Sequence, residues 1–111
     1  GHKDSDNVFQ NNVIEGNLKH GVYFRNESEP MAGHRNRIED NRIVNNGRDA
    51  DGVGIFIDGE TNGTVLIDNV IGNTGGKHIQ TIPIRIGEKA GPVIMEGNDL
   101  EGEVQDHRKS Q

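Results

Sequence analysis

Apolar residues recur along this chain in a fixed pattern rather than in continuous runs. The pattern is an apolar residue, two other residues, an asparagine, one further residue and a second apolar residue. Its four copies are Phe9/Asn12/Ile14, Ile38/Asn41/Ile43, Leu66/Asn69/Ile71 and Met95/Asn98/Leu100. The four asparagines are separated by 29, 28 and 29 residues. A nearly constant step of this length predicts a repeated structural unit in which each copy stacks on the next.

A second apolar motif lies between these copies. Two apolar residues flank one other residue and follow a glycine or a proline. The copies are Val22/Phe24 after Gly21, Ile55/Ile57 after Gly54, and Ile84/Ile86 after Pro83. Alternation with a period of two is the signature of a β-strand. The steps are 33 and 29 residues, so an insertion lies in the first full coil, and the composition of residues 26–35 predicts a loop there.

Each coil is therefore predicted to contain three short strands, paired in parallel with those of the next coil at about 4.8 Å. The inward side chains form apolar columns, because β-branched residues pack well in such rows. We expect a structural ladder of Asn12, Asn41, Asn69 and Asn98 at a sharp corner, with each asparagine in the left-handed conformation. A shorter ladder of Asn17, Asn46 and Thr74 is expected to follow it.

The composition agrees with strands joined by tight turns. Glycine is frequent at 16 residues, and only 30% of the residues are hydrophobic. Glycine, asparagine and β-branched residues are poor helix formers. The formal net charge of −6 argues against general binding to nucleic acid or to an anionic membrane. The chain has no cysteine, which excludes disulfides and thiolate metal sites, and no apolar run approaches the roughly 18 residues of a membrane span.

The segments 52–59 (GVGIFIDG) and 65–73 (VLIDNVIGN) resemble the repeat of right-handed parallel β-helix proteins, the pectate-lyase-like superfamily. The resemblance covers about residues 7–102. It implies an all-β fold, a single-stranded right-handed parallel β-helix or solenoid of three to four coils. Residues 1–6 are then an expression-tag remnant or a disordered terminus, and residues 103–111 a polar tail. Because the first coil starts midway, we expect a C-terminal fragment of a longer β-helix.

What this resemblance implies for function is broad. It favours part of a secreted or cell-surface carbohydrate-active protein, a polysaccharide lyase, hydrolase or epimerase, that is inactive as an isolated fragment. The alternative is a non-catalytic module for glycan binding or cell-surface structure, and a third hypothesis is a segment of a phage fibre. No catalytic signature of these enzymes is matched residue by residue, so whether the protein is an enzyme stays open and no catalytic residue is assigned.

In proteins of this superfamily the active groove usually follows one outer sheet and its loops. The equivalent outer face here belongs to the strands of the second motif. Its candidate carbohydrate-binding residues are Tyr23, Phe56 and Arg85 in one row, Arg25 and Asp58 in the next, and Lys19, His20, Lys77 and His78 in the preceding loops. Aromatic rings can stack on a sugar, and guanidinium groups can bind carboxylates. The structural alternatives are cross-strand packing of the rings and a surface ion pair of Arg25 with Asp58.

Two further predictions concern ions and partners. Asp49 and Asp51 offer oxygen ligands for Ca²⁺, although their sequence is first of all that of a turn. No other cofactor is predicted, and the histidines are too scattered for a zinc site. The uncapped N-terminal face of the stack exposes apolar residues and strand edges, which predicts either an end-to-end homodimer through that face or ordering of the terminal residues over the opening.

Overall fold

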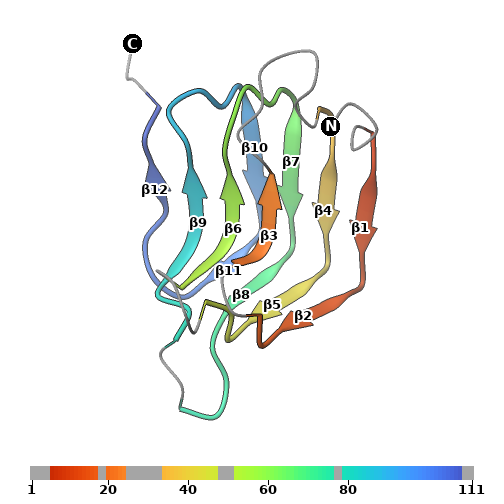
Figure 1. Cartoon of the computed structure of the whole chain (residues 1–111). Coiled ribbons are helices and arrows are strands. Elements are labelled where there is room, and N and C mark those ends of the chain that lie inside the picture. The colour runs from red at the N-terminus through yellow and green to blue at the C-terminus, as the bar shows by residue number, and fades with distance from the viewer. Residues whose placement is uncertain (1–5, 18–19, 25–33, 48–51, 77–78, 109–111) are drawn as a thin grey trace.

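The chain folds as a stack of four coils (Figure 1). The computed structural model describes residues 6–17, 20–24, 34–47, 52–76 and 79–108. These residues contain twelve short strands. None of the described residues forms a helix, so none forms one long and apolar enough to cross a membrane.

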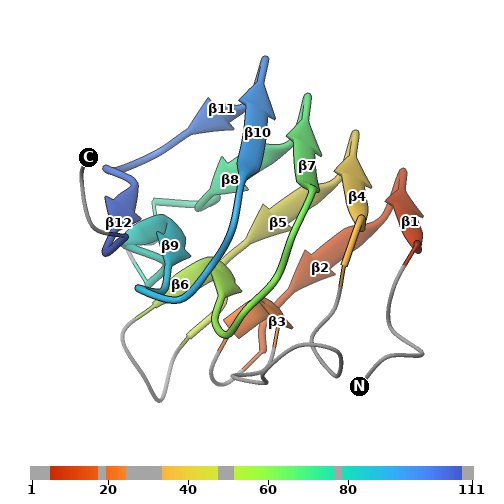
Figure 2. The same ribbon diagram turned by 90° about the horizontal axis from the view of Figure 1, so that it is seen from above.

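The strands form three parallel sheets, and each coil contributes one strand to each sheet. Sheet A contains β1 (Val8–Gln10), β4 (Arg37–Glu39), β7 (Thr64–Ile67) and β10 (Val93–Glu96). Sheet B contains β2 (Val13–Glu15), β5 (Arg42–Val44), β8 (Val70–Gly72) and β11 (Asp99–Leu100). Sheet C contains β3 (His20–Phe24), β6 (Val53–Ile57), β9 (Ile82–Ile86) and β12 (Gln105–Asp106). Seen from above, the three sheets enclose the interior of the solenoid (Figure 2).

The register of the sheets places equivalent residues of successive coils over one another, as the repeat predicts. In sheet A, Phe9 pairs with Ile38, Ile38 with Leu66, and Leu66 with Met95. The side chains of the interior columns are fully buried in the middle of the stack. Nine aliphatic side chains there have no exposed surface: Ile38, Ile43, Val53, Ile55, Ile57, Leu66, Ile71, Ile84 and Ile86. The all-β parallel solenoid with apolar columns is therefore confirmed.

The predicted asparagine ladder connects the corners between sheets A and B. It consists of Asn12, Asn41, Asn69 and Asn98. The main-chain N–H of each of the first three donates to Oδ1 of the next asparagine, at 2.9–3.0 Å. The Nδ2 group of each of the last three donates back to a strand carbonyl of the preceding coil, at 2.7–2.9 Å. The ladder thus satisfies main-chain groups that would otherwise be buried without partners at the corner.

The left-handed residue at this corner is not the ladder asparagine, which corrects the expectation from the sequence. It is the preceding residue, with φ of 60° at Asn11, 54° at Asp40, 55° at Asp68 and 66° at Gly97. These residue types tolerate positive φ. Because the turn is made one position earlier, the asparagine itself can keep an ordinary φ and direct its amide along the stack.

The second ladder contains Gln80 and not Thr74, a second correction. Asn17 donates to Asn46 Oδ1 from its main-chain N and its Nδ2, at 3.1 and 3.0 Å. Asn46 Nδ2 donates to Gln80 Oε1 at 2.8 Å. Thr74 instead exchanges two hydrogen bonds with Asn45. An insertion after Thr74 displaces the equivalent position along the sequence, and a glutamine reaches back to the ladder.

The last coil extends into the segment that the sequence assigned to a polar tail. Gln105 and Asp106 form β12 and pair with Arg85 and Ile86 of β9. Val104 packs against the core, which anchors the strand. The boundary at residue 103 is therefore corrected, and the stack continues at least to β12.

An ion pair at the end of this coil predicts a pH dependence of stability. Arg108 donates to the Asp106 carboxylate from Nη2 and Nε at 2.7 and 2.9 Å, and these bonds lower the pKa of Asp106 to about 2. A lowered carboxyl pKa stabilises the fold fully above the ordinary value of 3.8 and loses its effect as the pH falls towards 2. Because the pair is partly exposed, it contributes at most about 1 kcal/mol to the free energy of unfolding.

This prediction is tested by denaturant unfolding of the wild type and Asp106→Asn between pH 5 and pH 2. The wild type is expected to be the more stable at pH 5, and the difference should shrink as the pH falls. A difference in the free energy of unfolding that stays constant over this range would contradict a stabilising role of the ionised pair.

Candidate functional site

The outer face of sheet C gathers aromatic and charged side chains in one row. Tyr23 of β3 pairs with Phe56 of β6, Phe56 with Arg85 of β9, and Arg85 with Gln105 of β12. The strand alternation that directs the neighbouring aliphatic residues into the core directs these side chains outward. The predicted row of Tyr23, Phe56 and Arg85 is therefore present, and Gln105 extends it into the fourth coil.

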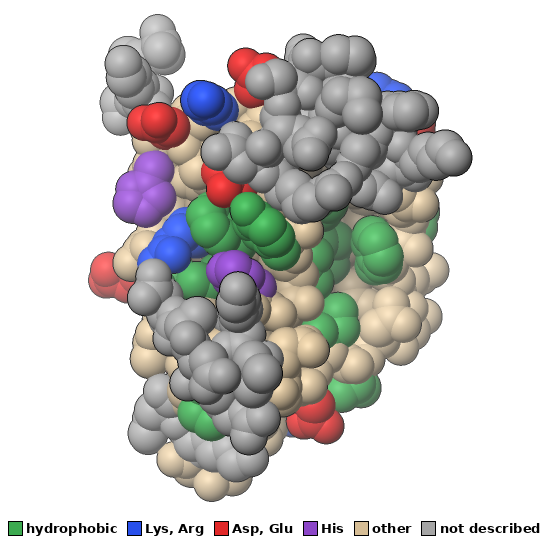
Figure 3. Space-filling model, in the orientation of Figure 1, with side chains coloured by type: hydrophobic (Ala, Val, Ile, Leu, Met, Phe, Trp, Pro, Cys, Tyr) green, Lys and Arg blue, Asp and Glu red, His purple; other side chains and the backbone are tan. Residues whose placement is uncertain are grey.

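Contacts along the row make it a continuous surface. The rings of Tyr23 and Phe56 have centroids 5.3 Å apart and are tilted by 44°. The Arg85 guanidinium carbon lies 5.5 Å from the centroid of the Phe56 ring, a cation–π distance. Arg85 Nε also donates to Gln105 Oε1 at 2.9 Å, which fixes the orientation of the guanidinium plane. This face is the one turned to the viewer in Figure 3, where hydrophobic side chains lie beside histidine and basic side chains.

His20 and Asp58 join this row, and we name the five residues His20, Tyr23, Phe56, Asp58 and Arg85 the aromatic face. The His20 ring stacks on Tyr23 with centroids 5.0 Å apart and an interplanar angle of 21°. Tyr23 Oη donates to Asp58 Oδ2 at 3.3 Å. Tyr23 is 45% exposed. The rings thus keep an accessible surface with an acidic group at one side and a basic group at the other.

The other predicted members of the site lie outside the described residues. The carbohydrate-binding candidates Lys19, Arg25, Lys77 and His78 lie outside the described residues, so the predicted ion pair of Arg25 with Asp58 stays a prediction. The calcium candidates Asp49 and Asp51 lie outside them as well. Elsewhere in the described chain, no three His, Cys, Asp or Glu side chains come together as a metal site.

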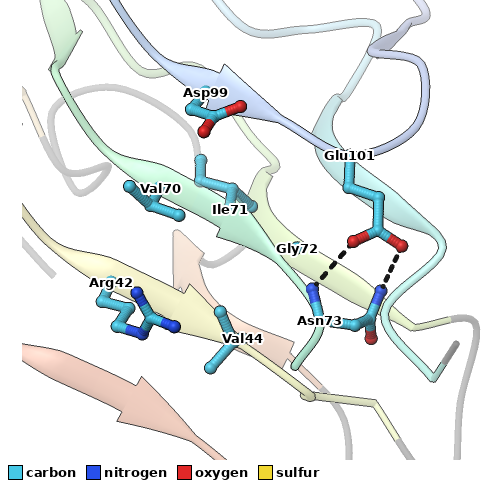
Figure 4. A pocket seen from close by; sticks show the side chains of 8 residues that line it. All are labelled: Arg42, Val44, Val70, Ile71, Gly72, Asn73, Asp99 and Glu101. Carbon is cyan, nitrogen blue, oxygen red and sulfur yellow. Dashed lines mark hydrogen bonds between the residues drawn. The ribbon is translucent and has the colours of Figure 1, made fainter. Parts of the chain in front are cut away.

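A shallow hollow of about 150 Å³ lies on a different face, the outer side of sheet B. Gly72 of β8 forms its floor between Val44 and Glu101, and Figure 4 shows both Glu101 carboxylate oxygens directed at Asn73. The main-chain N and Nδ2 of Asn73 donate to these oxygens at 3.1 and 3.0 Å. The hydrogen bonds hold Glu101 over Gly72, where an added Cβ would lie only 2.9 Å from Glu101 Cβ. The hollow has no aromatic lining, unlike the aromatic face.

Comparison with known proteins agrees with this fold. A family model described as a right-handed β-helix region matches residues 2–102. The chain therefore belongs to the right-handed β-helix family, and the coils wind with the hand that parallel strand connections favour. No curated protein and no solved structure matches the chain. Since one fold can carry many activities, function has to be argued from the residues of the site.

Proposed function

We propose that the aromatic face binds a saccharide and that the protein acts as a glycan-binding β-helix module. The observation that carries the proposal is the continuous row of Tyr23, Phe56 and Arg85 across three coils. A pyranose ring presents a face of C–H groups that can lie on exposed aromatic rings. Its hydroxyl or carboxylate groups can then bind the flanking Asp58 and Arg85, since guanidinium groups bind carboxylates in a bidentate manner.

The arrangement supports binding more directly than catalysis. Hydrolysis of a glycosidic bond usually requires two carboxyl groups flanking the bond, separated by roughly 5–9.5 Å. Within the aromatic face, Asp58 supplies one carboxylate, which accepts a hydrogen bond from Tyr23. The hypothesis of a lyase, hydrolase or epimerase therefore rests on the family resemblance, whereas binding rests on the geometry of this face. Binding to extracellular glycans would place the protein in the secreted or cell-surface compartment.

The proposal is tested by titrating the protein with neutral and uronic-acid oligosaccharides, each with and without Ca²⁺, and following amide NMR shifts. We expect the shifts to centre on β3, β6 and β9. A preference for uronic acids would indicate that Arg85 binds the carboxylate, and a requirement for calcium would support the prediction for Asp49 and Asp51. No binding to any of these saccharides, or shifts confined to other sheets, would refute the proposal.

The side chain of Tyr23 gives the sharpest single test of this face. Tyr23→Ala is expected to weaken saccharide binding about tenfold, which corresponds to about 1.4 kcal/mol. Tyr23→Phe should retain most of the affinity, because it keeps the ring and removes only the hydrogen bond to Asp58. Isothermal titration calorimetry measures both effects.

Ile94→Ala provides the matched control, because Ile94 is also an exposed apolar residue but lies in sheet A. It should leave the affinity unchanged. Equal affinities of wild type and Tyr23→Ala would show that the aromatic rings serve cross-strand packing alone.

A further inference from the structure

The dipeptide Asn-Gly occurs twice in this chain, as Asn46-Gly47 and Asn62-Gly63. Asparagine is among the thermolabile residues of proteins, and it is least protected when glycine follows it. Glycine has no Cβ to shield its main-chain nitrogen, and it gives the chain the freedom to bring that nitrogen against the asparagine side chain. The two copies share this chemistry, but the structure places them in opposite environments.

The side chain of Asn46 is held by the second ladder. It is fully buried, and its Nδ2 donates to Gln80 Oε1 at 2.8 Å and to Ile14 O at 3.1 Å. The main-chain N–H of Gly47 donates to Asn17 O at 2.8 Å, so the nitrogen that would attack Asn46 is already engaged. A reaction at this pair requires that the coil first opens locally.

The Asn62-Gly63 pair lies in the connection between β6 and β7 (Figure 1), where these restraints do not apply. Asn62 is exposed. Within the described part of the chain its side chain makes no hydrogen bond, and the N–H of Gly63 donates none. The φ of Gly63 is +72°, which favours glycine, so the turn itself maintains the reactive pair. The attacking nitrogen and the amide that it would attack are both available in the folded state.

The main chain around Asn62 is nevertheless tied to both neighbouring coils. Arg35 N donates to Asn62 O at 2.7 Å, and His34 forms an isolated parallel bridge with Asn62. On the other side, Gly91 N donates to Thr61 O at 2.8 Å. A change in the main chain at this position therefore acts on contacts between three successive coils.

We propose that Asn62 is a site of spontaneous deamidation in the folded protein. The main-chain nitrogen of Gly63 attacks Asn62 Cγ, the new N–C bond closes a cyclic succinimide, and Nδ2 leaves as ammonia with the proton that the Gly63 nitrogen gives up. Water from the solvent then adds to one of the two imide carbonyls. Opening of the bond to Cγ gives aspartate, and opening of the bond to the main-chain carbonyl carbon gives isoaspartate.

The two products differ in their effect on the coil. Aspartate keeps the length of the main chain and adds an exposed charge. Isoaspartate adds one carbon atom to the main chain, and it converts the carbonyl that accepts from Arg35 N into a carboxylate on a side branch. The bonds from Arg35 N and Gly91 N can then no longer form in the same register. We therefore expect the isoaspartate form to unfold at a lower urea concentration than the aspartate form.

Incubation of the folded protein in warm, mildly alkaline buffer, followed by peptide mass spectrometry, tests the proposal. Asn46 in the same molecule is the matched control. Replacement of the amide NH2 by OH adds mass, and fragment ions assign the change to Asn46 or Asn62. In the folded protein Asn62 should react at least about tenfold faster, because Asn46 reacts only from locally opened coils. In urea the two rates should agree within about twofold, because unfolding exposes both pairs.

Two variants separate the modification from its structural effect. Asn62→Gln has one more methylene group, which disfavours the ring closure, so its urea midpoint should not change on incubation, whereas the midpoint of the wild type should fall. Freshly prepared Asn62→Asp reproduces the aspartate product, and it should be more stable than the isoaspartate fraction separated from incubated wild type. Equal rates at Asn46 and Asn62 in the folded protein, or an Asn62 that reacts only after unfolding, would overturn the proposal.

Discussion

The Asn69→Ala variant is expected to lose about 4 kcal/mol of unfolding free energy. Asn69 is 1% exposed and lies in the middle of the ladder. Its Oδ1 accepts from Asn41 N at 3.0 Å and from Asn41 Nδ2 at 3.2 Å. Its Nδ2 donates to Ile38 O at 2.8 Å and to Asn98 Oδ1 at 2.9 Å. Alanine leaves a main-chain N–H and a carbonyl buried without partners, and each costs about 1–3 kcal/mol.

Urea unfolding measured by circular dichroism gives this difference, and Asn98→Ala is the matched control. Asn98 is partly exposed at the end of the ladder, where water can replace the lost partners, so we expect a loss of about 1 kcal/mol. Asn69→Asp keeps the acceptor but removes the two donors. Its free energy of unfolding should lie between those of the wild type and Asn69→Ala, or below that of Asn69→Ala if the charge stays buried. Equal losses for Asn69→Ala and Asn98→Ala would show that the ladder bonds contribute little to the stability of the stack.

The ladder and the columns could be predicted from the sequence because stacking forces equivalent residues into the same environment. Ile38, Leu66 and Met95 recur at a nearly constant step, and the same step relates their asparagines. A short strand in such a fold has no other way to pair its main chain than with its equivalent in the next coil. The register therefore follows from the period alone, without any information on individual contacts.

The repeat period does not predict which residue takes a given place where the chain contains an insertion or makes a turn. Thr74 has the sequence position of the second ladder, but the following insertion gives that place to Gln80. The recurrence of the asparagines points to them as the left-handed residues, although the preceding Asp40 and Asp68 also tolerate a positive φ. A more informative signal was the recurrence of Asn, Asp or Gly directly before every ladder asparagine.

In the candidate site, too, the sequence predicts which residues share a row but not which side chains contact one another. The common row of Tyr23, Phe56 and Arg85 followed from strand alternation and from the step between the coils. The stacking of His20 on Tyr23 and the hydrogen bond from Tyr23 to Asp58 depend on side-chain rotamers, which the repeat does not determine. Gln105 was missed because the polar residues around it suggested a tail, whereas Val104 is the residue that anchors this strand.

Gly54→Ala is expected to destabilise the fold by about 3 kcal/mol, for a steric reason that the repeat itself creates. A Cβ at Gly54 would lie 2.6 Å from Ile71 Cγ2 and 2.7 Å from the Pro83 carbonyl oxygen. Both neighbours belong to the packed interior, and the carbonyl is main chain of the next coil, so neither can withdraw without shifting a strand. Overpacking of this kind typically costs about 1–3 kcal/mol.

Urea unfolding of Gly54→Ala and two controls separates crowding from backbone strain. At Gly21 a Cβ would lie 2.6 Å from both Gly54 O and Ile43 Cγ2, but Gly21 belongs to the end strand, which can yield. Gly16 has open space around it and a φ of +73°, so Gly16→Ala reports backbone strain alone, at about 1 kcal/mol. The expected order of destabilisation is Gly54, then Gly21, then Gly16. A Gly54→Ala variant as stable as the wild type would mean that adjacent coils can separate at this position of β6. The close approach of the strands would then not be the reason for glycine before the apolar pair.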